Sequence, residues 1–209
     1  MCQFHKDFKL RNFEHPFTDG ISASCLAMSS SKVTILDDSP FPSTSYNLLP
    51  HIDEMGKSAK QFTVERARLL ELIENKELQD VFSVHLIHKH FDLPEGHIMV
   101  YETLKHKKLP EFQICSPRQA EGCTNLHGLY FLAHDNETMK AYEYTTDAVV
   151  NVQPHLNFIS SFSTALMEMG MERTFVLTVK RTNNKENLSE FEIPDLSSTV
   201  LVGRSKLAT

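Results

Sequence analysis

The chain has 209 residues, of which 41% are hydrophobic and 23% are charged, a composition that suits one globular core and is too short for two large domains. Its 21 Lys and Arg against 27 Asp and Glu give a net charge of −6, which argues against a general nucleic-acid-binding protein. No apolar run approaches the roughly 18–20 residues that a membrane span requires, so we expect no membrane partner.

The cysteines and the N-terminus favour a cytoplasmic protein. The four cysteines, Cys2, Cys25, Cys115 and Cys123, are too sparse for a disulfide-dependent scaffold. Residues 1–7 carry charges where a secretory signal would need an apolar stretch. We therefore expect reduced thiols in the cytoplasm.

The first part of the chain, residues 1–60, is predicted to be an irregular N-terminal arm. It is rich in Ser, Pro, Asp and Phe, with one short strand expected at residues 33–36. The aromatic residues Phe4, Phe8, Phe13 and Phe17 recur every four or five positions. We expect them to form a ridge against the main domain or against another subunit.

A helix and a β-hairpin are predicted next. Ser58 and Gln61 have the spacing of a capping box ahead of a helix that should end near Asn75. Residues 81–90 are rich in β-branched and aromatic side chains and predict a strand. A turn at residues 93–96 would return the chain as a second, antiparallel strand over residues 97–102.

The second half of the chain predicts another hairpin, from residues 126–133 and 139–144, followed by a helix. That helix should start near Pro154 and stop at Gly170, where a left-handed C-cap favours glycine. Strands are expected at residues 174–180, 190–193 and 199–202.

Together these elements predict a single α+β domain over residues 61–203, with a short C-terminal tail at 204–209. We expect a mainly antiparallel sheet with two helices packed on one face. A weak internal pseudo-repeat is also expected, because a helix leads by a short connection into a strand twice, at residues 78–84 and again at 171–177.

The candidate site comes from the histidines. The chain has 11 of them, and His88 and His90 are two apart on the predicted strand, so both rings should project from one face. If the predicted hairpin pairs residues whose numbers sum to 190, Glu102 lies opposite His88. Two histidines and a carboxylate are the ligands of many non-haem iron sites and of some catalytic zinc sites.

Two alternatives to this site remain open from the sequence. Cys115 and Cys123 could join His88 and His90 in a zinc site, although the cysteine spacing exceeds the usual two to four residues. Acid–base chemistry without a metal is also possible, in a pocket lined by His88, His90, Glu102, Tyr101 and Tyr130. The histidines could instead have only a structural role, with their rings hydrogen-bonded to the backbone.

The common catalytic and nucleotide-binding motifs are absent from the sequence. There is no G-x-S-x-G, H-E-x-x-H, C-x-x-C or G-x-G-x-x-G segment. If the protein is an enzyme, we expect lyase, isomerase or hydrolase chemistry on a small molecule, with zinc or iron as the candidate cofactor. The alternative is a non-enzymatic interaction or assembly protein, with a protein partner or a second copy of the chain.

The segment His85-Leu86-Ile87-His88-Lys89-His90-Phe91-Asp92-Leu93, together with residues 125–130 and 141–144, resembles a group of small uncharacterised proteins from filamentous fungi. The resemblance covers about residues 62–182 and rests on an H-x-H-F-x-L segment. It transfers no catalytic residue. It implies an intracellular protein with an accessory role in biosynthesis, such as secondary metabolism.

Overall fold

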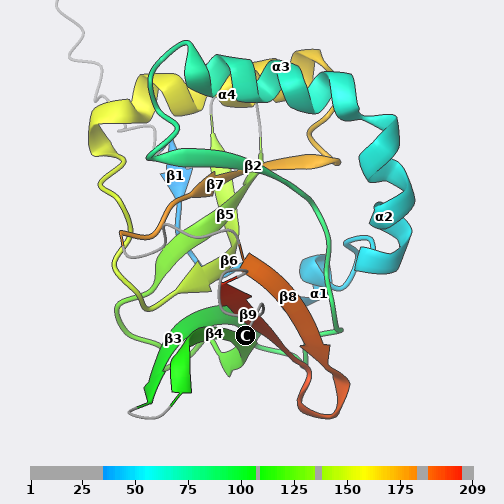
Figure 1. Ribbon diagram of the computed structural model, residues 1–209, viewed down its shortest axis with the longest axis vertical. Coiled ribbons are helices and arrows are strands. Elements are labelled where there is room, and N and C mark those ends of the chain that lie inside the picture. Colours follow the sequence, from blue (N-terminus) through cyan, green and yellow to red (C-terminus); the bar gives the residue numbers. More distant parts are fainter. Residues whose placement is uncertain (1–34, 107–108, 135–137, 183–187, 204–209) are drawn as a thin grey trace, which may run out of the picture. The chain divides into compact units, whose positions relative to one another are not determined.

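The computed structural model describes residues 35–106, 109–134, 138–182 and 188–203 (Figure 1). The aromatic series from Phe4 to Phe17, the cysteines Cys2 and Cys25 and the tail 204–209 lie outside these residues, as do the first two residues of the strand expected at 33–36.

The described residues form helices and strands in the following order: β1 (Leu36–Asp37), α1 (Ser43–Tyr46), α2 (Ile52–Gln61), α3 (Thr63–Glu74), β2 (Phe82–Leu86), β3 (His97–His106), β4 (Leu109–Gln119), β5 (His127–Ala133), β6 (Met139–Thr145), a 3-10 turn (Gln153–His155), α4 (Leu156–Glu168), β7 (Phe175–Val179), β8 (Leu188–Ile193), a second 3-10 turn (Pro194–Leu196) and β9 (Ser198–Gly203). Strands and helices are both well represented, so the α+β class is confirmed.

The strands make one curled, mixed sheet in the order β2-β7-β5-β6-β3-β4-β9-β8, with β1 beside β6 (Figure 1). Most neighbours are antiparallel, but β3 and β1 both pair with β6 in parallel. The described residues contain four α-helices. The prediction of a mainly antiparallel sheet is therefore correct, but the sheet also has parallel pairs, and the described residues form more than the two expected helices.

The largest core lies between the sheet and the layer of α3 and α4 (Figure 1). Phe82 and Val84 alternate along β2 and point to this layer, as the period of two in a strand requires. The helices contribute apolar side chains at helical spacing, and the buried members of this core include Leu69, Ile73, Ile159, Phe162, Leu166, Phe175 and Leu177.

The N-terminal half differs from the prediction in its helices. The helix expected from Ser58 to Asn75 is two helices, because the chain breaks at Phe62, which has φ −104° and ψ 30°. The Phe62 ring packs edge-on against Phe175, with centroids 6.5 Å apart. Residues 43–61, expected to be irregular, are largely helical in α1 and α2, and the buried side chains of Tyr46 and Met55 join them to the body.

The first predicted hairpin is wrong. β2 ends at Leu86 and pairs with β7, and β3 pairs with β4, a strand that was not expected from the sequence. The five residues of β7 are all buried, so this strand gives β2 an apolar neighbour that a local hairpin would not. Beyond β2 the backbone of Lys89 bonds instead to residues 50–52.

The second half agrees with its prediction. β5 and β6 form an antiparallel hairpin, and so do β8 and β9. Helix α4 ends at Glu168, and Gly170 follows with φ +65°, the left-handed conformation expected of a C-cap glycine.

The expected pseudo-repeat has a counterpart in the backbone hydrogen bonds. The amide of Leu78 donates to Ile73 O after α3, and the amide of Met171 donates to Leu166 O after α4. The strands that follow, β2 and β7, are direct antiparallel neighbours. Two reciprocal bonds flank them, from Ile87 N to Thr174 O and from Lys180 N to Val81 O. The two helix–strand units are thus related by a local two-fold arrangement.

Candidate functional site

The face of the sheet turned away from α3 and α4 carries most of the buried polar side chains. Directly opposite residues on neighbouring strands share a face, and the strand registers place on this one His85, Tyr101, Cys115, Tyr130, Glu143, Thr199 and Glu192. Tyr46 from α1 covers part of this face and donates a hydrogen bond from its hydroxyl to Glu143.

His88 and His90 follow the end of β2 and come together over this face. Their Nε2 atoms are 3.1 Å apart, and their ring centroids are 4.8 Å apart at an interplanar angle of 85°. The segment is fixed because Lys89 N donates to Pro50 O and Ile52 N donates to Lys89 O. The pairing of the two histidines was predicted, but they stand beyond the strand rather than on it.

Two carboxylates of β8 complete the group. Glu190 Oε1 lies 3.2 Å from His90 Nε2, and Glu192 Oε1 lies 2.9 Å from His90 Nδ1. Sequence reasoning missed both residues. The available signal was the alternation of glutamates at positions 190 and 192 of a predicted strand, which puts both on one face, but nothing in the sequence linked that strand to residues 88–90.

The second ring nitrogen of each histidine is already engaged. His88 Nδ1 lies 2.9 Å from the carbonyl oxygen of Leu86, and His90 Nδ1 faces Glu192. Both partners only accept hydrogen bonds, so each Nδ1 donates its proton. In neutral rings the two Nε2 lone pairs would then face each other, which is unfavourable unless a proton or a metal cation lies between them.

The charges of the group push its pKa values apart. Burial alone would lower the pKa of His90, but the hydrogen bond and charge of Glu190, with Glu192, outweigh burial and raise it to about 9. Burial and the charge of His90 lower the pKa of His88. Burial opposes ionisation of Glu190, yet the His90 contact lowers its pKa overall. In the metal-free state the shared proton therefore resides on His90.

The same group is suited to a metal ion. Within the described ranges, ligand atoms of His88, His90 and Glu190 all lie within 4.8 Å of one another. Ligands bound tetrahedrally to zinc lie about 3.3 Å apart, close to the 3.1 Å and 3.2 Å contacts of His90 Nε2. The Leu86 carbonyl and Glu192 are the outer partners that orient metal-bound imidazoles in proteins.

The prediction that Glu102 joins His88 and His90 is wrong. It pairs with Ile114 in the β3–β4 ladder, one position from the Tyr101–Cys115 pair, so its side chain points to the opposite face of the sheet. There it accepts a hydrogen bond from Arg118 at 2.8 Å. The prediction depended on the hairpin between residues 81–90 and 97–102, which does not form.

The two cysteines do not join the histidines either. Cys115 is buried on the face of β4 that is turned away from α3 and α4. Burial raises the pKa of its thiol well above the usual range, which disfavours the thiolate that metals bind. Cys123 is partly exposed, and its thiol lies 3.1 Å from the carbonyl oxygen of Gln119. Neither belongs to the group of close metal-ligating atoms found among the described residues.

A buried carboxyl group lies on the same face of the sheet. Tyr46 and Tyr101 donate hydrogen bonds of 3.0 Å and 3.1 Å to the two oxygens of Glu143. Burial and the charge of Glu190 raise the pKa of Glu143 to about 7, against the lowering effect of the two phenols and of His90. Glu143 therefore exchanges a proton near neutral pH.

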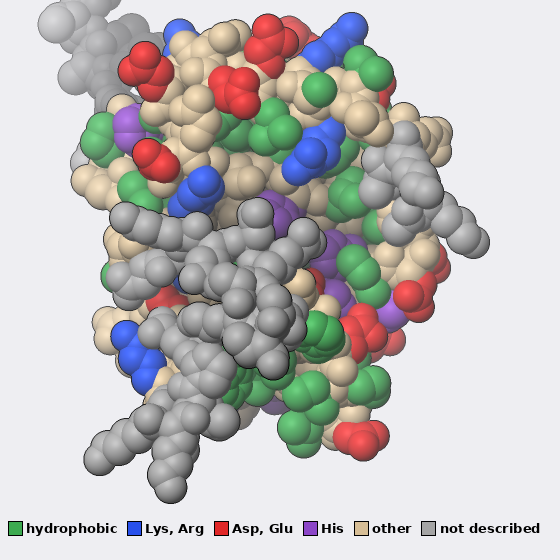
Figure 2. Space-filling model, viewed as in Figure 1, with side chains coloured by type: hydrophobic (Ala, Val, Ile, Leu, Met, Phe, Trp, Pro, Cys, Tyr) green, Lys and Arg blue, Asp and Glu red, His purple; other side chains and the backbone are tan. Residues whose placement is uncertain are grey.

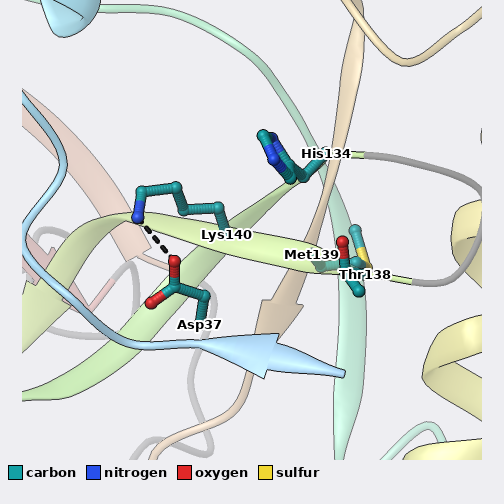
Figure 3. Close-up of a pocket in the computed structure, with 5 residues that line it drawn as sticks. All are labelled: Asp37, His134, Thr138, Met139 and Lys140. Carbon is teal, nitrogen blue, oxygen red and sulfur yellow. Dashed lines mark hydrogen bonds and ion pairs between the residues drawn. The ribbon is translucent and has the colours of Figure 1, made fainter. Parts of the chain in front are cut away.

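A separate pocket of about 330 Å³ lies beside β1 and β6 (Figure 3). Its charged side chains neutralise each other, since Lys140 donates to Asp37 at 2.6 Å and to Ser39 at 2.8 Å. His134 and Thr138 also line it. Because the lysine and the aspartate are already paired, the histidine group is the stronger candidate for chemistry.

Comparisons of the chain with protein-family models, with curated proteins and with solved structures gave no match. In the part of the chain that the structure describes, no helix is both long enough and apolar enough to cross a membrane.

Proposed function

We propose that this protein binds a divalent metal ion, zinc or iron(II), through His88, His90 and Glu190 and uses it to act on a small organic molecule. The observation that carries the proposal is the contact between the two Nε2 atoms at 3.1 Å, with both Nδ1 atoms already donating elsewhere. Such a pair needs a proton or a metal ion between its lone pairs, and Glu190 supplies a negative charge that suits a divalent metal ion.

The donor set favours catalysis over a purely structural metal site. Two histidines and one carboxylate leave a fourth position for water or substrate, whereas structural zinc sites are closed by four protein ligands. A metal in such a site lowers the pKa of its bound water and polarises a carbonyl. This chemistry supports a hydrolase, a lyase or an isomerase. We further propose that the protein acts in the cytoplasm, in an accessory step of a biosynthetic pathway.

Metal titration of purified protein tests the proposal. After treatment with a chelator, the protein should bind about one zinc per chain, measured by calorimetry and elemental analysis. His88→Ala and His90→Ala should abolish stoichiometric binding. Glu192→Gln should weaken it about 10–100-fold, as loss of an outer partner does.

The control is His97→Ala, which removes an imidazole whose Nδ1 atom lies 3.0 Å from the carbonyl oxygen of Glu95 and which is not one of the clustered ligands. It should bind zinc like the wild type. Wild-type protein that binds no zinc or iron(II) above the level of the His88→Ala variant would refute the proposal.

A second candidate is a non-enzymatic protein in which His90 is a structural clasp. It is favoured by the two carboxylates that flank His90 and by its pKa of about 9, because a doubly protonated imidazole between two glutamates needs no metal. In that case His90→Ala would lower the melting temperature of the protein, while zinc would leave it unchanged.

A further inference from the structure

The hairpin of β8 and β9 is joined to the rest of the sheet by little backbone. β8 is the last strand of the sheet order, and within the described ranges its backbone pairs with β9 alone. β9 in turn pairs with β4 over a short stretch, residues 199–201 against residues 113–115. Because regions with few backbone hydrogen bonds open at a lower free-energy cost, the hairpin is held less firmly than the central strands.

The free side of the hairpin is held by side chains. Glu190 and Glu192 of β8 contact His90 at 3.2 Å and 2.9 Å. No backbone hydrogen bond among the described residues joins β8 to residues 86–93. Figure 1 shows the chain that leaves β2 passing beside the hairpin, and Figure 2 shows histidine side chains gathered near the middle of the molecule in the same view. These contacts of His90 form a clasp that can open without breaking a strand pair.

Beneath the hairpin lies the face of β4 that is turned away from α3 and α4. On this face Cys115 lies opposite Thr199 of β9 and shares a buried cluster with Leu201. Gln113, opposite Leu201, is 8% exposed, and its side-chain oxygen has no hydrogen-bond partner within the described part of the chain. Buried polar groups are normally paired. The closed hairpin thus leaves unsatisfied an atom that solvent or a ligand would reach if the hairpin moved.

The proposed metal ligands come from both sides of the clasp. His88 and His90 follow β2, whereas Glu190 belongs to the hairpin. Opening the hairpin would take Glu190 away from the two imidazoles and uncover β4 at the same time. A metal ion bound by all three side chains would hold the hairpin closed.

We propose that the β8–β9 hairpin is a flap, kept closed by the clasp of His90 with Glu190 and Glu192, whose opening admits small molecules to the sheet face beneath it. The flap bends at the short ladder between β9 and β4. This inference deepens the proposed function, because it describes how a substrate reaches the metal ligands. It rests on that function only for the effect of zinc, since the clasp is formed without a metal.

Cys115 is a natural reporter of the opening, because it is 1% exposed in the closed structure. With Cys2, Cys25 and Cys123 replaced by serine, it is the only thiol left in this parent chain, and its alkylation by N-ethylmaleimide can be followed by mass spectrometry. In metal-free protein, His90→Ala should speed the alkylation about tenfold or more, because the rate follows the population of the open state. Zinc should slow alkylation of the parent about tenfold and leave His90→Ala unchanged.

The controls separate opening of the flap from unfolding of the whole protein. Ile159→Val loosens the core under α4, on the other face of the sheet, and should change the alkylation rate less than about twofold. Urea below the unfolding transition should barely change the rate, because a local opening exposes little surface. His97→Ala, which is not one of the clustered ligands, should react like the parent. Glu192→Gln should speed alkylation about threefold, so the test holds if His90→Ala does not fold.

Three results would overturn the inference. The first is an equal alkylation rate in the parent, in His90→Ala and in Glu192→Gln. The second is a rate that rises with urea as steeply as global unfolding does, and the third is an acceleration in Ile159→Val as large as that in His90→Ala. Faster alkylation of His90→Ala, with no effect of zinc on the parent, would uphold the flap and refute the metal-dependent function.

Discussion

The imidazole of His90 is held from both sides, by Glu190 at 3.2 Å and Glu192 at 2.9 Å, with the His88 ring against it. Among single residues, these contacts of His90 determine whether the site holds a proton or a metal ion. A proton suffices to keep the four groups together, and a metal ion fits the same position. The competition between them makes metal affinity fall as pH falls, because ligating imidazoles must be free of protons at the binding atom.

Glu143 gives a pH dependence that can be measured on stability. Its pKa rises from 4.5 in an unfolded chain to about 7 in the fold, so the folded state binds the extra proton between these values and loses stability as pH rises through them. The effect amounts to about 3 kcal/mol at pH 8. Glu143→Gln should remove it, and urea unfolding at pH 5, 6, 7 and 8 is the measurement. Parallel pH profiles for variant and wild type would contradict the assignment.

Among the elements, the two helix–strand units, α3 with β2 and α4 with β7, differ in the residue at one corresponding position. This difference predicts how substitutions there change stability. The connection after α3 has Glu77 at φ 56°, and the connection after α4 has Gly170 at φ +65°. Only glycine adopts this conformation without steric strain. The local repeat therefore has a favourable residue in one unit and an unfavourable one in the other.

Placing glycine in the first unit and removing it from the second should change the free energy of unfolding in opposite directions. Glu77→Gly should raise the free energy of unfolding by about 0.5–1 kcal/mol, and Gly170→Ala should lower it by about 1 kcal/mol. A Cβ at Gly170 meets nothing within 4 Å, so backbone strain alone carries that loss. Chemical denaturation checks both. A loss of stability in Glu77→Gly would show that the glutamate side chain outweighs the strain.

The sequence predicted elements well where the signal was local. Pro154 and Gly170 marked the start and the end of the helical segment that contains α4, and the strands after it were correctly placed. The prediction of the first hairpin was wrong because strands distant in the sequence compete to pair, and β2 pairs with β7. For the same reason Glu102 is not the partner of His88 and His90: the hairpin that would have placed it opposite His88 does not form, and its side chain lies on the other face of the sheet.

For the whole molecule, the histidine group spans the sheet. β2 and β8 are the two ends of the strand order, and residues 88–90 leave β2 to contact Glu190 and Glu192 on β8. Side chains, and a metal where one is bound, thus link strands that share no backbone hydrogen bonds. Metal binding should therefore stabilise the entire fold and not the loop alone.

This link predicts a concentration-dependent stabilisation. Zinc at 100 times its dissociation constant should raise the free energy of unfolding of the wild type by about 2.7 kcal/mol. It should leave His88→Ala unchanged, whereas His97→Ala should respond like the wild type. Thermal or chemical unfolding with and without zinc is the measurement. Equal stabilisation of His88→Ala would place the metal elsewhere.

The most direct test of the metal site is the X-ray absorption spectrum of the zinc-loaded protein at the zinc edge. Ligation by His88, His90 and Glu190 predicts two imidazole nitrogens and one or two oxygens at about 2.0–2.2 Å, with no sulfur. A sulfur shell at about 2.3 Å would instead assign the metal to cysteine, and would contradict the site that the histidine–glutamate group defines.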